Sequence, residues 1–294
     1  MTLDQLTRVC PAFTPCSAPI RTATSLLQPG SLDGQPVIAK QPIDPRPWWH
    51  DRCRHEITVY RAFQFTGPPP VPVPTLVAAD PDIPLLVLTT LPGEALHPDR
   101  YPARGTFPPK AARRLLATLR HLHEWSPSSA RAFPDDSDYP NQLASIPSEL
   151  LDAAAVAMLT ELHRRAGTRT ELSHGDAHPG NARADRGQQL ALLDFEFTAW
   201  RPAGYDHAKL FVFLADNPAA RAAVLHDLQP GTADQAGFWI AVVLVTCREL
   251  ISHRRHPDLP HRDVRLAQLT TDLRNALAQT HRLHQQLPPT GGTA

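Results

Sequence analysis

Two short polar segments carry the residue types that phosphoryl transfer requires. The first runs from His174 to Asn181 as His-Gly-Asp-Ala-His-Pro-Gly-Asn, and the second reads Asp-Phe-Glu from residue 194. A hydroxyl that attacks the terminal phosphate of a nucleotide needs a carboxylate to accept its proton, and Mg²⁺ needs oxygen ligands. Asp176 suits the first role, while Asn181 and Asp194 suit the second. The spacing therefore indicates a kinase-type active site.

Two other interpretations of the first segment stand beside this one. His174, Asp176 and His178 alternate, so on a β-strand they would share one face and could bind Zn²⁺. Pro179 followed by Gly180 argues against a strand that continues through the segment. The segment could also be a polar loop beside a buried strand. The Asp-Phe-Glu that follows favours phosphoryl transfer over both.

The two segments resemble the aminoglycoside phosphotransferases and their choline-kinase-like relatives. The catalytic loop of that family reads His-Gly-Asp-x-His-x-x-Asn, and its metal loop reads Asp-Phe/Trp-Glu. By this resemblance Asp176 is the catalytic acid/base, and Asn181 and Asp194 hold Mg²⁺. The resemblance also implies that His174 orients the loop. Asp206, from Tyr-Asp-His-Ala, would cap the following helix and brace the catalytic loop through hydrogen bonds.

The same resemblance implies a fold and a cofactor set. We expect a two-lobed protein-kinase-like fold of the α+β class. Residues 1–91 would form a small antiparallel β-sheet lobe with a helix, which binds the nucleotide. Residues 92–294 would form a larger, mainly helical lobe with the catalytic loop, the metal loop and the acceptor-binding helices. The expected phosphate donor is ATP, used with Mg²⁺.

One lysine in the N-terminal part is a candidate phosphate ligand. The apolar segment 37–40 ends in Lys40, like the kinase strand whose lysine holds the α- and β-phosphates. Only three of the 29 basic residues are lysines, so a lysine here is not background composition. Sixteen residues later, Glu56 lies in a segment with apolar residues at helical spacing, and its carboxylate could fix Lys40 by a salt bridge. Glu56 could instead lie on a solvated helix face.

The nucleotide's base and phosphates need further groups. Thr89, Thr90 and Leu91 end a run of Leu and Val, and their backbone groups could pair with adenine as a kinase hinge does. A plain strand-to-helix turn fits the same position. Residues 14–27, where a phosphate-covering loop is expected, contain Ser and Thr but no Gly. Hydroxyls and non-Gly amides would have to replace the usual Gly-rich loop there.

The hydrophobic pattern predicts the elements that position these groups. One helix and five strands are expected in the N-terminal lobe, with Gly30 and Gly34 in the turn of a hairpin that joins residues 23–27 to 37–40. Residues 126–142, rich in Ser, Asp and Pro, are predicted to form a loop. Later helices are predicted at residues 109–125, 148–166, 206–215, 218–227, 233–254 and 261–285.

Length and composition suit two lobes of one enzyme. The chain has 294 residues, 42% of them hydrophobic, and no net charge, so neither a nucleic acid nor an anionic membrane is indicated as partner. The four cysteines form no Cys-x-x-Cys pair and are expected to be reduced thiols of a cytoplasmic protein. The longest apolar stretch, Phe238–Val245, is too short to span a bilayer and predicts a buried helix.

The acceptor is expected to be a hydroxyl of a small molecule, such as a sugar, an antibiotic or a related metabolite. From Phe197 onward the chain has ten Lys or Arg and eight Asp or Glu, a balance that does not suit a polycation such as an aminoglycoside. Residues 247–256 offer a basic, His-bearing surface for a neutral or anionic acceptor, or only a solvated helix face.

Two further functions stay open. Relatives of this fold look able to phosphorylate Ser or Thr of biosynthetic precursor peptides, and dependence on a partner protein would favour that function here. The missing glycines would also fit a non-catalytic, kinase-like binding protein. The intact Asp176, Asn181 and Asp194 oppose this last function.

Overall fold

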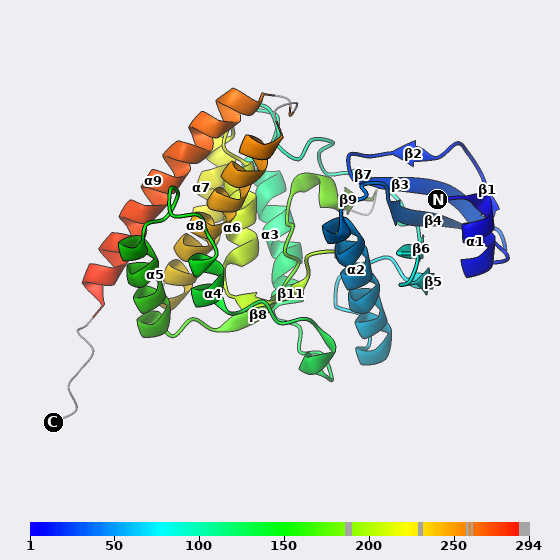
Figure 1. Cartoon of the computed structure of the whole chain (residues 1–294), viewed down its shortest axis with the longest axis horizontal. Coiled ribbons are helices and arrows are strands. Elements are labelled where there is room, and N and C mark those ends of the chain that lie inside the picture. Colours follow the sequence, from blue (N-terminus) through cyan, green and yellow to red (C-terminus); the bar gives the residue numbers. More distant parts are fainter. Residues whose placement is uncertain (186–189, 229–231, 257–258, 260, 288–294) are drawn as a thin grey trace. The chain divides into compact units, whose positions relative to one another are not determined.

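The computed structural model divides into two compact units (Figure 1). The first unit comprises residues 1–96, 124–134 and 180–198, and the second comprises residues 97–123, 135–179 and 199–294. The structure describes residues 1–185, 190–228, 232–256, 259 and 261–287. The expected division after Leu91 treats each lobe as one continuous segment, whereas each compact unit is assembled from three.

The first unit is built on a six-stranded antiparallel sheet, one strand more than expected. The sheet order is β1-β3-β4-β6-β5, and β2 also pairs with β3. Two short strands, β1 and β2, lie along β3, because the Pro-containing segment between them interrupts the ladder. The strands are β1 (Thr14–Pro15), β2 (Ile20–Arg21), β3 (Ser25–Leu32), β4 (Gln35–Pro42), β5 (Leu76–Asp80) and β6 (Leu85–Thr89).

The predicted hairpin between β3 and β4 is confirmed, but only one of the two glycines is in its turn. Asp33 and Gly34 both have positive φ, 48° and 79°, as a two-residue hairpin turn requires. Gly30 lies inside β3, and a Cβ there would come within 2.3 Å of the Phe13 ring and 2.7 Å of the Thr14 carbonyl oxygen. Close approach of another strand, rather than a turn, therefore requires Gly30.

Two helices, not one, accompany this sheet. The unpredicted α1 (Leu3–Val9) begins with a capping box formed by Thr2 and Gln5, and its Leu6 packs in the same core as Val37 of β4. The longer α2 (Pro47–Thr66) buries one face, including Glu56, and contacts β4, β5 and β6. A second small sheet joins β7 (Glu94–Ala95), β9 (Ala182–Ala184) and β10 (Leu190–Leu192).

The second unit is mainly helical, as predicted. Its helix α5 starts later than expected, because Asp152 accepts a hydrogen bond from the Ala155 N–H and caps it. The predicted loop 126–142 is divided between the units: its 3₁₀ turn η1 (Ala130–Ala132) belongs to the first unit, and the start of α4 belongs to the second. The elements are α3 (Pro109–His123), α4 (Tyr139–Ala144), α5 (Ala153–Ala166), β8 (Thr170–Ser173), β11 (Ala199–Pro202), α6 (Tyr205–Phe213), α7 (Pro218–Asp227), α8 (Thr232–Arg255) and α9 (Arg262–Gln286).

One helix, α8, forms the centre of this unit. It contacts α5, α6 and α9, which lie beside it in Figure 1. The segment Ala233–Arg255 is long and apolar enough to cross a membrane by length and composition, but 78% of its apolar window is buried inside the structure. Such burial is typical of the core helix of a globular domain and agrees with the buried helix predicted around Phe238–Val245.

Candidate active site

The catalytic loop is tied to α6 by one carboxylate. β8 ends at Ser173, and Asp206 of α6 accepts hydrogen bonds from the backbone N–H groups of His174 (2.7 Å) and Gly175 (2.8 Å). Gly175 has φ of 82°, a conformation that favours glycine. The bracing expected of Asp206 is therefore present. Its expected capping role is wrong, because Gly204 is the N-cap and no side chain caps the helix.

A buried histidine that the sequence did not single out completes this brace. The Nε2 atom of His123 lies 2.8 Å from Asp206 Oδ2, and its Nδ1 lies 3.6 Å from Glu171 Oε1. Burial alone would lower the pKa of His123, but the two carboxylates outweigh it and raise that pKa above its usual value. The two carboxylates therefore favour the imidazolium form of His123, which stabilises the carboxylate holding the catalytic loop.

We expect His123→Gln to lower the free energy of unfolding by about 3–5 kcal/mol at about pH 6, because two buried carboxylates lose their cation. A group whose pKa is raised in the folded state stabilises the protein while it is protonated, so the loss should shrink as the pH rises through the His123 pKa. Denaturant titrations over a pH series measure this. The exposed His121 of the same helix supplies the control, His121→Gln. A loss independent of pH would contradict the imidazolium.

Asp176 is surrounded by basic side chains. Both its oxygens contact the Arg100 guanidinium, at 3.0 and 3.2 Å, while Lys209 Nζ lies 3.3 Å from Oδ1 and His178 Nε2 lies 3.5 Å from Oδ2. Burial would raise the pKa of Asp176, but Arg100 and Lys209 outweigh it and hold that pKa well below its usual range. The carboxylate is therefore ionised at neutral pH.

His174 and His178 flank this carboxylate on a loop. The N–H of Asp176 donates to His174 Nδ1 at 3.3 Å, which is consistent with the expected orienting role of His174. The segment between Ser173 and Pro179 is not a strand, so the alternating side chains do not share a strand face as the Zn²⁺ interpretation required. Of the basic residues around Asp176, Lys209 could have been noticed in the sequence, since it is one of only three lysines.

The metal loop belongs to the first unit and is anchored by its aromatic residue. Phe195 is fully buried against Tyr60 and Phe63 of α2, at ring-centroid distances of 5.7 and 5.1 Å. Asp194 has φ of 65°, an unusual conformation for a residue other than glycine. The N–H of the preceding Leu193 donates to the Asn181 carbonyl at 2.9 Å. The backbone thus joins the loop that carries Asp194 to the residue expected to share its metal.

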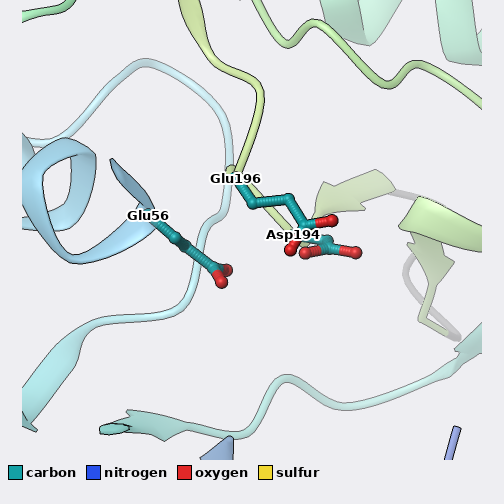
Figure 2. A group of neighbouring side chains, drawn as sticks. All are labelled: Glu56, Asp194 and Glu196. Carbon is teal, nitrogen blue, oxygen red and sulfur yellow. The ribbon is translucent and has the colours of Figure 1, made fainter. Parts of the chain in front are cut away.

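Three carboxylates converge beside the metal loop (Figure 2). Glu56 comes from α2, and Asp194 and Glu196 from the segment after β10, with one oxygen of each within 4.8 Å of the others. Lys40 Nζ lies 2.8 Å from Glu56, 2.5 Å from Asp194 and 3.3 Å from Glu196. The predicted Lys40–Glu56 ion pair is confirmed. Glu196 was not singled out as a ligand, although it lies in the Asp-Phe-Glu motif.

The charge of this cluster suits a cation in addition to Lys40. Burial alone would lower the pKa of Lys40, but Asp194, Glu196 and Glu56 outweigh it and raise that pKa, so the ammonium stays charged. Burial raises the pKa of Glu56, and its Oε1 is buried with no hydrogen-bond partner among the described residues. Three carboxylates around one ammonium form an oxygen donor set of the kind that Mg²⁺ prefers.

Hydroxyl groups close the turn where a Gly-rich loop was expected. Between β2 and β3, Thr22 Oγ1 accepts from the Ser25 N–H at 2.9 Å and from the Thr24 N–H at 3.3 Å, and donates to the Ser25 carbonyl at 3.0 Å. A side-chain hydroxyl thus stabilises a tight turn that contains no glycine. The register of β3 and β4 pairs Leu27 with Lys40. The turn before Ser25 therefore lies near Lys40, at the end of the sheet where β3 begins.

Two backbone N–H groups of the expected hinge already donate hydrogen bonds within the first unit. The N–H of Thr89 donates to the Thr75 carbonyl, and the N–H of Thr90 donates to the Pro36 carbonyl. The carbonyl of Leu91 accepts from Arg183 at 3.0 Å. A base bound to this segment would therefore have to use the Thr90 carbonyl and the Leu91 N–H rather than the first two N–H groups.

Solved structures of low sequence identity share this fold. A choline/ethanolamine kinase family protein from Mesorhizobium loti is 14% identical, with a TM-score of 0.66 over 95% of this chain and 97% of that one. APH(2")-IIia, in complex with GDP and kanamycin, is 15% identical, with a TM-score of 0.60 over 94% and 97%. The macrolide 2'-phosphotransferase from Brachybacterium faecium is 18% identical, with a TM-score of 0.54 over 91% and 97%. The predicted α+β, protein-kinase-like fold is confirmed.

No curated protein matches the sequence significantly. A family model described as the phosphotransferase enzyme family matches residues 30–239, well over half of the chain. The match includes Lys40, the catalytic loop and the metal loop. The predicted resemblance is thereby confirmed, and the chain belongs to the phosphotransferase enzyme family.

Proposed function

We propose that this protein is an ATP-dependent phosphotransferase that transfers the γ-phosphate to a hydroxyl group of a small molecule. The observation that carries the proposal is the Asp176 carboxylate, whose side chain is 3% exposed. It is kept ionised by Arg100 and Lys209, and its loop is held in place by hydrogen bonds to a second buried carboxylate. A buried, ionised and positioned carboxylate is what a general base for a hydroxyl requires.

In the proposed reaction the acceptor oxygen attacks the γ-phosphorus while Asp176 accepts the hydroxyl proton. A P–O bond to the acceptor forms, the bond to the bridging oxygen of ADP breaks, and ADP leaves with that electron pair. Lys40 would bind the α- and β-phosphates. Asn181 and Asp194 would hold Mg²⁺, with Glu196 beside them, and the bound ion would neutralise phosphate charge.

The donor and the acceptor are inferred from different observations. APH(2")-IIia and an aminoglycoside 2'-phosphotransferase-IIIa were solved with GDP, so GTP is the alternative to ATP as donor. A small-molecule acceptor is preferred to a peptide because two buried aromatic residues hold the segment 126–142 in place. Phe133 is 4% exposed against Phe63, and Tyr139 is fully buried against His163.

We also propose a cytoplasmic protein without a nucleic-acid or membrane partner. Its cysteines are free thiols, and three of the four are buried. Burial raises the pKa of Cys53 and of Cys247 to about 12, so both thiols stay protonated and unreactive at neutral pH.

The proposal is tested with purified protein, γ-labelled nucleotide and a panel of hydroxyl compounds. ATP and GTP are compared with and without Mg²⁺, and both hydrolysis and labelled product are recorded. We expect Mg²⁺-dependent binding and slow hydrolysis of one nucleotide in the absence of acceptor, and faster turnover with a small-molecule acceptor. Absence of Mg²⁺-dependent binding for both nucleotides would contradict the proposal. Transfer only to a peptide would support the peptide-kinase alternative instead.

Lys40 and Glu56 are expected to act as one unit in nucleotide binding. Lys40→Ala should weaken ATP binding by about 10-fold or more, because it removes a phosphate ligand and leaves three carboxylates without their cation. Glu56→Ala should weaken it less, because Asp194 still contacts Lys40. The double variant should fall short of the sum by about 0.5–3 kcal/mol.

Calorimetric titration of the two single variants, the double variant and a matched control gives this coupling directly. Asp51→Ala alters an exposed carboxylate on the same helix as Glu56, and it should leave ATP affinity unchanged. If the free-energy changes of the two single variants simply add, the ion pair plays no part in nucleotide binding.

A further inference from the structure

The cluster around Asp176 contains more cations than the proposed chemistry uses. Arg100 and Lys209 each contact both Asp176 and Glu249: the Arg100–Glu249 distance is 3.8 Å and the Lys209–Glu249 distance is 3.7 Å. Phe213 lies beneath both cations, with its ring centroid 4.6 Å from the Arg100 guanidinium carbon and 5.0 Å from Lys209 Nζ. We call these five residues the acceptor-side cluster, since the acceptor hydroxyl has to reach Asp176.

Arg100 is the member of this cluster that faces solvent. It lies in the loop before α3, and 39% of its side chain is exposed, against 3% for Asp176, 13% for Lys209 and 11% for Glu249. Its guanidinium fork binds both oxygens of Asp176. A carboxylate held in this way is a poor partner for an incoming hydroxyl, so Arg100 has to release at least one oxygen before Asp176 can accept a proton.

The charges next to this cluster are not balanced. Arg265, 5% exposed, lies over the Tyr101 ring at 4.4 Å, and the Tyr101 hydroxyl donates to Glu249 at 2.5 Å. Arg265 also interacts with Asp272, but both oxygens of Asp272 are bound by Arg221, at 2.9 and 2.5 Å. Four cations therefore face three carboxylates. This excess disfavours a cationic acceptor and favours an anionic one.

We propose that the acceptor carries an anionic group, a carboxylate or a phosphate, which binds Arg100 and Lys209 and thereby draws Arg100 away from Asp176. The inference rests on the proposed function and adds the chemical class of its substrate. The guanidinium fork of Arg100 already binds the carboxylate of Asp176, so an anionic group of the acceptor can replace that carboxylate with hydrogen bonds of the same kind. Arg100 is then a specificity-determining residue: binding of the correct acceptor frees the base that activates its hydroxyl.

The test follows the side-chain NMR signals of Arg100, assigned from their loss in Arg100→Gln, while four compounds are added to the full chain. D-gluconate and glycerol phosphate carry an anion and hydroxyls, D-sorbitol is neutral and D-glucosamine is cationic. We expect a saturable shift with at least one of the two anions and none with sorbitol or glucosamine. The two anions distinguish a carboxylate from a phosphate site.

Three variants give the expected order of affinities. Because the Arg100 signals are absent from both Arg100 variants, the anion affinities of the variants and the wild type are compared by calorimetric titration. Arg100→Gln should weaken anion binding by about 10–100-fold, because charge-assisted hydrogen bonds are lost. Arg100→Lys keeps the positive charge but loses the two-point guanidinium fork. Its anion affinity should therefore lie between those of the wild type and Arg100→Gln. Arg104→Gln alters an exposed arginine of the same loop and should bind as wild type. No saturable shift with either anion, or equal shifts with sorbitol or glucosamine, would overturn the proposal.

Magnesium-dependent ATP binding is measured on the same preparation. If ATP binds and the anions do not, only the acceptor inference fails. If ATP does not bind, the proposed phosphotransferase function fails, whatever the anions do.

Discussion

Asp176→Asn is expected to lower turnover by about 10²–10⁴-fold while ATP affinity stays near that of the wild type. The amide keeps the size of the side chain and its hydrogen-bonding capacity, but it cannot take the proton of the acceptor. ATP hydrolysis, or transfer to an acceptor once one is found, is measured beside an ATP titration. Near-normal phosphorylation by this variant would remove Asp176 as the catalytic base.

A melting curve on the same preparation separates catalysis from structure. Glu249 still contacts both Arg100 and Lys209 in the variant, so we expect a stability loss of only about 1–3 kcal/mol. If Asp176 were mainly structural, stability and ATP affinity would fall together. The control is Asp99→Asn, which alters a 68% exposed carboxylate next to Arg100 in the sequence and should change neither quantity.

Asp194→Ala is expected to abolish Mg²⁺-dependent ATP binding, a loss of about 100-fold or more, because the charge of the phosphates is left uncompensated. Of the three carboxylate residues Glu56, Asp194 and Glu196, only Asp194 has a backbone in the left-handed conformation. Calorimetry with ATP, with and without Mg²⁺, measures the effect. An affinity equal to that of the wild type would exclude Asp194 from the nucleotide site.

The unusual backbone of Asp194 calls for a second variant. Alanine at φ of 65° adds strain, whereas asparagine adopts this region readily. Asp194→Asn should therefore fold as well as the wild type and still lose Mg²⁺-dependent binding. Binding that is lost only in the alanine variant would point to the backbone rather than to the metal. Asp82→Ala, at an exposed position of the same unit, is the control for both.

Features that depend on residues close together in the chain could be predicted from the sequence. The spacing of His174, Asp176 and Asn181 indicated the chemistry, because a short loop fixes the relative reach of its own side chains, and the Asp-Phe-Glu from Asp194 supported it. The Asp-Gly dipeptide predicted the hairpin that places Lys40, since only a few residue types adopt positive φ at both central positions. The Lys40–Glu56 pair was within reach of sequence reasoning because strand and helix are consecutive.

The groups that surround these residues could not be predicted from the sequence, because they come from distant parts of the chain. Arg100 lies 76 residues from the Asp176 that it binds, and His123 lies 83 residues from Asp206. No spacing rule links such positions, because their contact depends on how loop, strand and helix pack together. Arg100 is also one of many arginines, so composition gave no signal for it. Sequence patterns report local geometry, whereas the charge balance around the proposed base is a property of the packed unit.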